Sequence, residues 1–60
     1  MYQVRVKKFG SRRWKVVAEF ETRREAHRYA CRLEYSNRTT ENEYDNVEIK
    51  YPDGTRFTIA

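Results

Sequence analysis

The chain has 60 residues, with 13 Lys and Arg against 9 Asp and Glu, so its formal net charge is +4. A chain of this length forms one domain, residues 1–60, which buries only about 60% of the surface of the unfolded chain and leaves little room for a deep pocket. The single cysteine, Cys31, excludes an internal disulfide, and the apolar runs are too short for a membrane span or an export signal, so we expect a cytoplasmic protein without membrane contact.

Alternating side chains predict two strands in the first third of the chain. Apolar residues stand at even positions over residues 2–7, and the pattern repeats over residues 14–20. Gly10 and Ser11 lie between the two segments, where a loop with an odd number of residues puts both apolar sets on one face. We therefore expect the chain to open with an antiparallel hairpin.

A helix is expected next, because Thr22 and Glu25 have the spacing of a capping box. Apolar residues then follow at i, i+3, i+4 and i+7, and two of them are alanines, which let a helix lie close to a sheet. The wholly polar segment 36–43 predicts the exit loop. The apolar stripe consists of Ala26, Tyr29, Ala30 and Leu33.

A second hairpin is expected near the end of the chain. Residues 47–51 alternate, and Pro52, Asp53 and Gly54 have the residue types of a tight turn, with glycine at the position that needs a positive φ. If the turn closes symmetrically, the apolar residues of both strands share one face. The expected pairs are Tyr51 with Thr55, Ile49 with Phe57, and Val47 with Ile59.

These elements predict an α+β fold in which a single helix packs on one face of a four-stranded, mainly antiparallel sheet, in the order ββαββ. The pattern leaves the strand order open between a β-grasp arrangement and a simple meander. The expected core comprises Val4, Val6, Trp14, Val16, Phe20, Ala26, Ala30, Leu33, Val47, Ile49, Phe57 and Ile59.

Charge is concentrated in the first half of the chain, where residues 1–32 carry ten basic and three acidic side chains. The same alternation that buries the apolar residues sends several of these cations to the outer face of the first hairpin. Like charges directly opposite one another destabilise a sheet, so they need either an acid from a neighbouring strand, such as Glu48, or an external anion. The expected opposed pairs are Arg5 with Lys15 and Lys7 with Arg13, or Lys7 with Lys15 in the next allowed register.

A polyanion is the natural partner of such a face, because Lys and Arg that meet backbone phosphates release condensed counterions. We therefore predict a nucleic-acid-binding protein, with DNA the expected partner, although a merely solvated sheet face would carry the same pattern. A second basic row on the predicted helix is a further candidate contact. The predicted nucleic-acid-binding residues are Arg5, Lys7, Arg13 and Lys15 on the hairpin and Arg24, Arg28 and Arg32 on the helix.

Enzymatic chemistry is not expected, and neither is a cofactor or a metal. His27 and Cys31 stand at i and i+4, but zinc usually takes four ligands and the chain has no other His or Cys. The same two residues lack a third group to orient them as a catalytic unit. The acids at 41, 43 and 45 lack the glycine and terminal glutamate of a calcium loop.

Residues 2–35 resemble the sheet-plus-helix DNA-binding domains of the phage-integrase arm-type and ethylene-response-type families. The resemblance rests on Val4-Arg5, Gly10, Arg13-Trp14, the run 20–26 and Tyr29. It implies that a sheet enters the major groove while the helix braces it from behind. By position, it implies DNA contacts from Arg5, Lys7, Arg13, Lys15 and Trp14. Those families place three strands before the helix, whereas the pattern here predicts two before and two after.

An alternative function follows from the β-grasp order, which resembles small immunoglobulin-binding and ubiquitin-like domains. It implies a protein-interaction module, such as a phage or bacterial accessory or inhibitor protein, that binds an acidic protein through a strand edge or the helix face. An edge strand of so small a domain could also pair with a second copy to form a homodimer.

Overall fold

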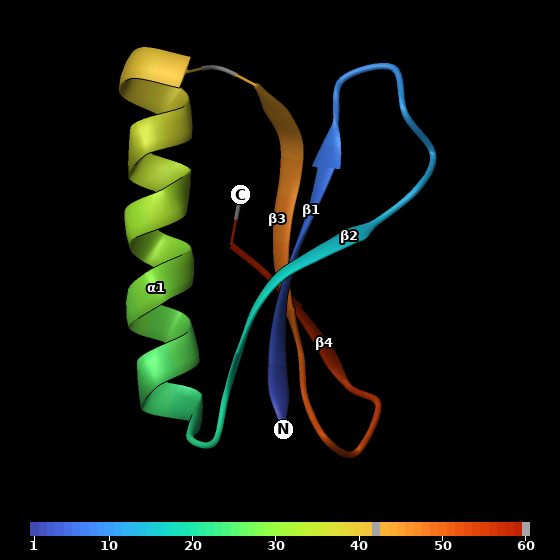
Figure 1. The fold of residues 1–60 in the computed structure, drawn as a ribbon, viewed down its shortest axis with the longest axis vertical. Helices are drawn as coiled ribbons and strands as arrows, with labels where there is room; N and C mark the ends of the chain where they lie inside the picture. The colour runs from blue at the N-terminus through green and yellow to red at the C-terminus, as the bar shows by residue number, and fades with distance from the viewer. Residues whose placement is uncertain (42, 60) are drawn as a thin grey trace.

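Residues 1–41 and 43–59, which the computed structural model describes, form the predicted four strands and one α-helix in the order ββαββ. The elements are β1 (Tyr2–Lys8), β2 (Lys15–Phe20), α1 (Arg23–Ser36), β3 (Tyr44–Lys50) and β4 (Arg56–Thr58). Figure 1 shows α1 beside the sheet, with the loop between β1 and β2 extending from the end of the molecule at which α1 finishes. The α+β fold class predicted from the sequence is confirmed.

The sheet has the strand order β2-β1-β3-β4, and every neighbouring pair is antiparallel. This order differs from a meander, in which β2 would pair with β3, and from a β-grasp sheet, in which β1 would pair with β4. Because β2 and β3 both run antiparallel to β1, they are parallel to each other, and the connection through α1 carries the chain across β1. The central strands are therefore β1 and β3. Among the described residues, no helix is long and apolar enough to cross a membrane.

The helix begins where the capping signal places it. The Thr22 hydroxyl accepts a hydrogen bond from the Glu25 backbone N–H at 3.3 Å, and α1 starts at Arg23. This bond satisfies one of the backbone donors that the first turn leaves without a partner. The predicted start of the helix is confirmed.

The exit from α1 corrects the expected loop at 36–43. A π-helical turn, η1 (Asn37–Glu41), continues the helical path, and residue 42 lies outside the described residues. The Asn37 side chain ties the turn to the next strand, since its Oδ1 accepts from the Glu43 and Tyr44 N–H groups at 2.6 and 2.7 Å. The segment has no glycine or proline to stop a helix, so its polar composition alone did not mark a loop.

The second hairpin follows the predicted register. The Tyr51 N–H donates to the Thr55 carbonyl at 2.7 Å, and Ile49 pairs with Phe57. Gly54 has φ +93°, as the turn requires. Hydrogen bonds from the Thr55 backbone and side chain lower the pKa of Asp53 below its ordinary value of 3.8. This carboxylate therefore stabilises the turn above that value and loses the contribution as pH falls through the lowered pKa.

The core lies between α1 and the two central strands. Its fully buried side chains come from β1 (Val4, Val6), β3 (Val47, Ile49) and α1 (Ala26, Ala30). Phe20, Leu33 and Ile59 pack against them, as predicted, and so do Tyr2, Val17, Ala18, Tyr44 and Tyr51.

Trp14 and Val16 are corrections to the predicted core, and a β-bulge in β2 is the reason. Val4 pairs with Ala18 but Arg5 pairs with Val16, so Val17 is an extra residue that reverses the alternation beyond it. Val16 consequently joins Arg5 on the outer face, the face away from α1, and is 44% exposed. The Trp14 ring lies on the same face, with the Arg5 guanidinium carbon 5.4 Å from its centroid.

Phe57 is the third correction to the predicted core. It faces the same side of the sheet as Ile49, but it belongs to the edge strand β4 and is 47% exposed. The His27 ring of α1 lies 5.1 Å from the Phe57 ring and covers it only in part.

Candidate nucleic-acid interface

Arg5, the first of the predicted contacts, is neutralised inside the protein. It pairs with Glu48 across the central strands β1 and β3, and both its Nε, at 2.9 Å, and its Nη2 donate to the Glu48 Oε1. The two side chains are only 15% and 6% exposed. The sequence predicts that either Glu48 or an external anion neutralises this cation, and the structure shows Glu48 in that role. Arg5 is therefore committed to an internal ion pair and not free to meet a phosphate.

Lys7 also has a carboxylate partner on the outer face. Its Nζ lies 3.6 Å from the Asp45 Oδ2 and 5.8 Å from the centre of the Trp14 ring. Lys8, next along β1, lies 3.2 Å from Glu43. Glu43, just before β3, and Asp45, near its start, thus offset Lys8 and Lys7 at the end of β1.

Lys15 does not lie on the outer face. Its partner across the ladder is Val6, whose side chain is in the core, and residues directly opposite one another point to the same face. The bulge at Val17 therefore turns Lys15 to the inner face, the side on which α1 lies. The expected opposition of Lys15 to Arg5 or Lys7 is wrong for this reason.

Arg13 lies in the loop before β2 and is exposed. Its backbone N–H donates to the Ser11 hydroxyl at 3.1 Å. The strand begins only at Lys15, so the expected pairing of Arg13 with Lys7 across the hairpin is wrong. Neither Arg13 nor Lys15 forms an ion pair within the described part of the chain.

The row of arginines on α1 has the arrangement that its spacing predicts. Arg24, Arg28 and Arg32 are exposed on successive turns of α1. Four residues rise about 6 Å along a helix, so the row is about 12 Å long. No ion pair or hydrogen bond holds any of these three side chains over residues 1–41 and 43–59. We call these three residues the arginine ridge.

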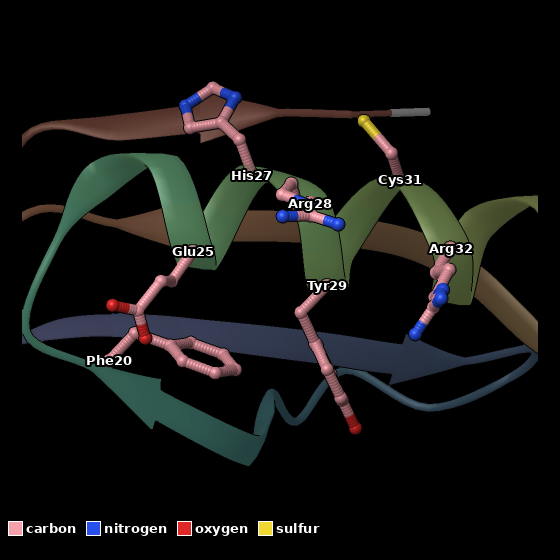
Figure 2. Close-up of a pocket in the computed structure, with 7 residues that line it drawn as sticks. All are labelled: Phe20, Glu25, His27, Arg28, Tyr29, Cys31 and Arg32. Carbon is pink, nitrogen blue, oxygen red and sulfur yellow. The ribbon is translucent and has the colours of Figure 1, made fainter.

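A shallow depression lies along α1 beside the arginine ridge. Figure 2 shows Tyr29 and Arg32 pointing from α1 toward the β2 side, where Phe20 lies, while His27 and Cys31 point the opposite way. The rings of Tyr29 and Phe20 are 5.4 Å apart at an angle of 48°. The sequence pattern places Tyr29 in the apolar stripe and in the family resemblance, and it does not predict Tyr29 as a surface contact. The lining residues are Phe20, Glu25, His27, Arg28, Tyr29, Cys31 and Arg32.

His27 and Cys31, the pair considered from the sequence as a metal or catalytic site, lie on the other flank of α1 (Figure 2). The His27 Nε2 is hydrogen-bonded to the Tyr51 hydroxyl at 2.9 Å, which ties α1 to the end of β3, and Cys31 is an exposed free thiol. No group of three His, Cys, Asp or Glu side chains gathers among the described residues. Within the described residues, His27 therefore has Tyr51 as a hydrogen-bond partner and is not part of a cluster of metal-binding side chains.

Comparison of the chain with models of known protein families, with curated proteins and with solved structures gives no match in any of the three. The resemblance of residues 2–35 to the integrase arm-type and ethylene-response-type domains therefore remains a prediction from the residues alone.

Proposed function

We propose that the protein is a small, non-enzymatic nucleic-acid-binding protein that contacts phosphates mainly through the arginine ridge of α1. The observation that carries the proposal is the exposure of Arg24, Arg28 and Arg32 without carboxylate partners in the described part of the chain, in contrast to Arg5 and Lys7. Cations that are already paired gain little from a phosphate, because they must give up an existing ion pair to reach it. Unpaired arginines release counterions from the polyanion with no such loss.

The dimensions of the ridge suit a phosphate backbone. Successive phosphates of one DNA strand rise about 3.4 Å along the duplex axis and also wind around it, so they lie further apart than this rise. A row about 12 Å long is long enough for its arginines to meet neighbouring phosphates. Lys15, turned to the inner face, adds a cation on the same side of the sheet as α1. The net charge of +4 favours association with a polyanion at long range.

The salt dependence of binding tests this assignment. With three phosphate contacts, a plot of log K against log salt should have a slope of about −2.7 for duplex DNA and about −2.1 for a single strand. The variant Arg24→Gln/Arg28→Gln/Arg32→Gln should flatten that slope toward zero. Fluorescence anisotropy with labelled oligonucleotides over a series of salt concentrations measures both quantities.

The matched control removes the same amount of charge elsewhere. Lys50 and Arg56 face each other on the outer face, and Arg12 lies exposed in the hairpin loop. Replacing all three with glutamine should leave the slope close to that of the parent. Equal flattening in both triple variants would mean that only net charge matters, and the ridge would no longer be the contact surface.

A second candidate function is a protein-interaction module, and the edge strand β2 favours it. Among the residues that the structure describes, no strand pairs with one side of β2, and Val16 is exposed on its outer face. An edge of this kind can accept a strand from a partner protein or from a second copy. If neither duplex nor single-stranded probes bind at low salt, the nucleic-acid proposal is rejected and this second function is favoured.

A further inference from the structure

Tyr29 is a half-exposed aromatic residue in the middle of the proposed phosphate-binding surface. It is 37% exposed, and the centre of its ring lies 5.4 Å from the centre of the Phe20 ring. Within the described residues its hydroxyl has no hydrogen-bond partner. Phe20, which packs against the core, contacts the Tyr29 ring at a tilt, and the ring remains partly open to solvent.

Two arginines and one glutamate, Arg28, Arg32 and Glu25, line the depression with this ring. Arg28 precedes Tyr29 in the chain, Arg32 follows it one turn later, and all three line the same depression (Figure 2). Arg32 and Tyr29 leave α1 in the same direction, whereas Arg28 projects between the two flanks of the helix. A planar ring beside unpaired guanidinium groups offers a stacking partner for a base and charge for the phosphates next to it.

We propose that this surface takes single-stranded nucleic acid, with one base stacked on Tyr29 and the adjoining phosphates held by Arg28 and Arg32; the inference rests on the proposed function above. A paired base in a duplex already stacks on its neighbours and has no free face for the tyrosine. A single strand presents its bases, and every base has an aromatic face, so the recognition tolerates sequence.

Three probes of equal length test the proposal with the full chain at fixed low salt. They are an oligothymidylate of about 12 nucleotides, the corresponding abasic oligomer and a duplex. A length of about 12 nucleotides fits the site sizes of small single-strand-binding domains. The abasic oligomer keeps the phosphates and lacks the bases. One stacked base should make the oligothymidylate bind about 5- to 150-fold more tightly than the abasic oligomer.

Variants at Tyr29 assign the difference to the ring. Tyr29→Phe should keep the preference for the oligothymidylate, and Tyr29→Ala should abolish it while abasic binding stays unchanged. Tyr35→Ala is the matched control, because Tyr35 is an exposed tyrosine of α1 outside the depression, and it should keep the preference. Circular dichroism verifies folding. If Tyr29→Ala unfolds, Tyr29→Trp in a Trp14→Phe background should show fluorescence quenching by the oligothymidylate and none by the abasic oligomer.

The outcomes separate the two proposals. Equal affinity for the oligothymidylate and the abasic oligomer, with a salt slope that the ridge variant flattens, would reject stacking and keep phosphate binding. Tighter binding of the duplex than of the oligothymidylate would reject the single-strand assignment. Failure of all three probes to bind would reject the nucleic-acid function itself.

Discussion

Replacing Glu48 with alanine is expected to lower the free energy of unfolding by about 3–5 kcal/mol. The substitution leaves the Arg5 side chain, which lies on the outer face of the sheet and is only 15% exposed, without the carboxylate that accepts its hydrogen bonds. A largely buried charge without its partner costs far more than the ion pair contributes, because it has lost most of its water and, among the described residues, keeps only the contact with the Trp14 ring. A small domain has little stability to spare, so the variant should be largely unfolded. Urea denaturation followed by circular dichroism measures the loss.

A double variant distinguishes a missing partner from a misfolded strand. In Arg5→Met/Glu48→Leu both charges are replaced by apolar side chains, and the stability should return to near the parental value or rise above it. A loss below about 1 kcal/mol for Glu48→Ala would be typical of an exposed ion pair, and it would contradict the buried arrangement of Arg5 and Glu48.

Replacing Ile49 with alanine is expected to cost about 2–5 kcal/mol, whereas replacing Phe57 with alanine should cost only about 1 kcal/mol. The two residues are directly opposite one another and face the same side of the sheet. Ile49 is fully buried in the central strand β3, while the Phe57 side chain is half-exposed at the edge. Removing buried methylene groups also leaves a cavity, and this additional loss does not arise at an open edge.

The same denaturation experiment compares the two substitutions, each against the parent protein. Because the residues are a cross-strand pair on the same face of the sheet, the difference reports on how much of the protein covers each side chain. Equal costs would mean that the core does not centre on β1 and β3 beneath α1.

Local signals in the sequence were sufficient to predict the elements of this fold. The alternation in residues 2–7 and 47–51, the Thr22 cap and the turn at 52–54 each depend on neighbouring residues, and each appears in the structure as predicted. The strand order depends on which distant segments pair, and alternation alone carries no such information. The Arg5–Glu48 ion pair depends on that strand order. The sequence therefore indicated Glu48 as a candidate partner of the outer-face cations, but it could not show which cation Glu48 contacts.

The bulge explains most of the remaining differences. Val16 and Val17 are both β-branched and apolar, so nothing in the sequence shows which of them is the extra residue. The bulge reverses the alternation at every position between it and the hairpin loop. For this reason Trp14 faces outward and Lys15 faces inward. The arginine ridge was predictable because the helical period is not interrupted between Arg24 and Arg32.

The extra residue at Val17 also divides the first hairpin into two parts with separate constraints. Between the bulge and Phe20, the inward-facing side chains pack beneath α1, so substitutions there must preserve this packing. Between the bulge and the loop, the side chains at 14 and 16 face away from the core and do not take part in it. Loop-side positions can therefore exchange polarity during evolution without disturbing the interior. A deletion at 17 would remove that independence, because the whole segment ahead of it would change sides at once.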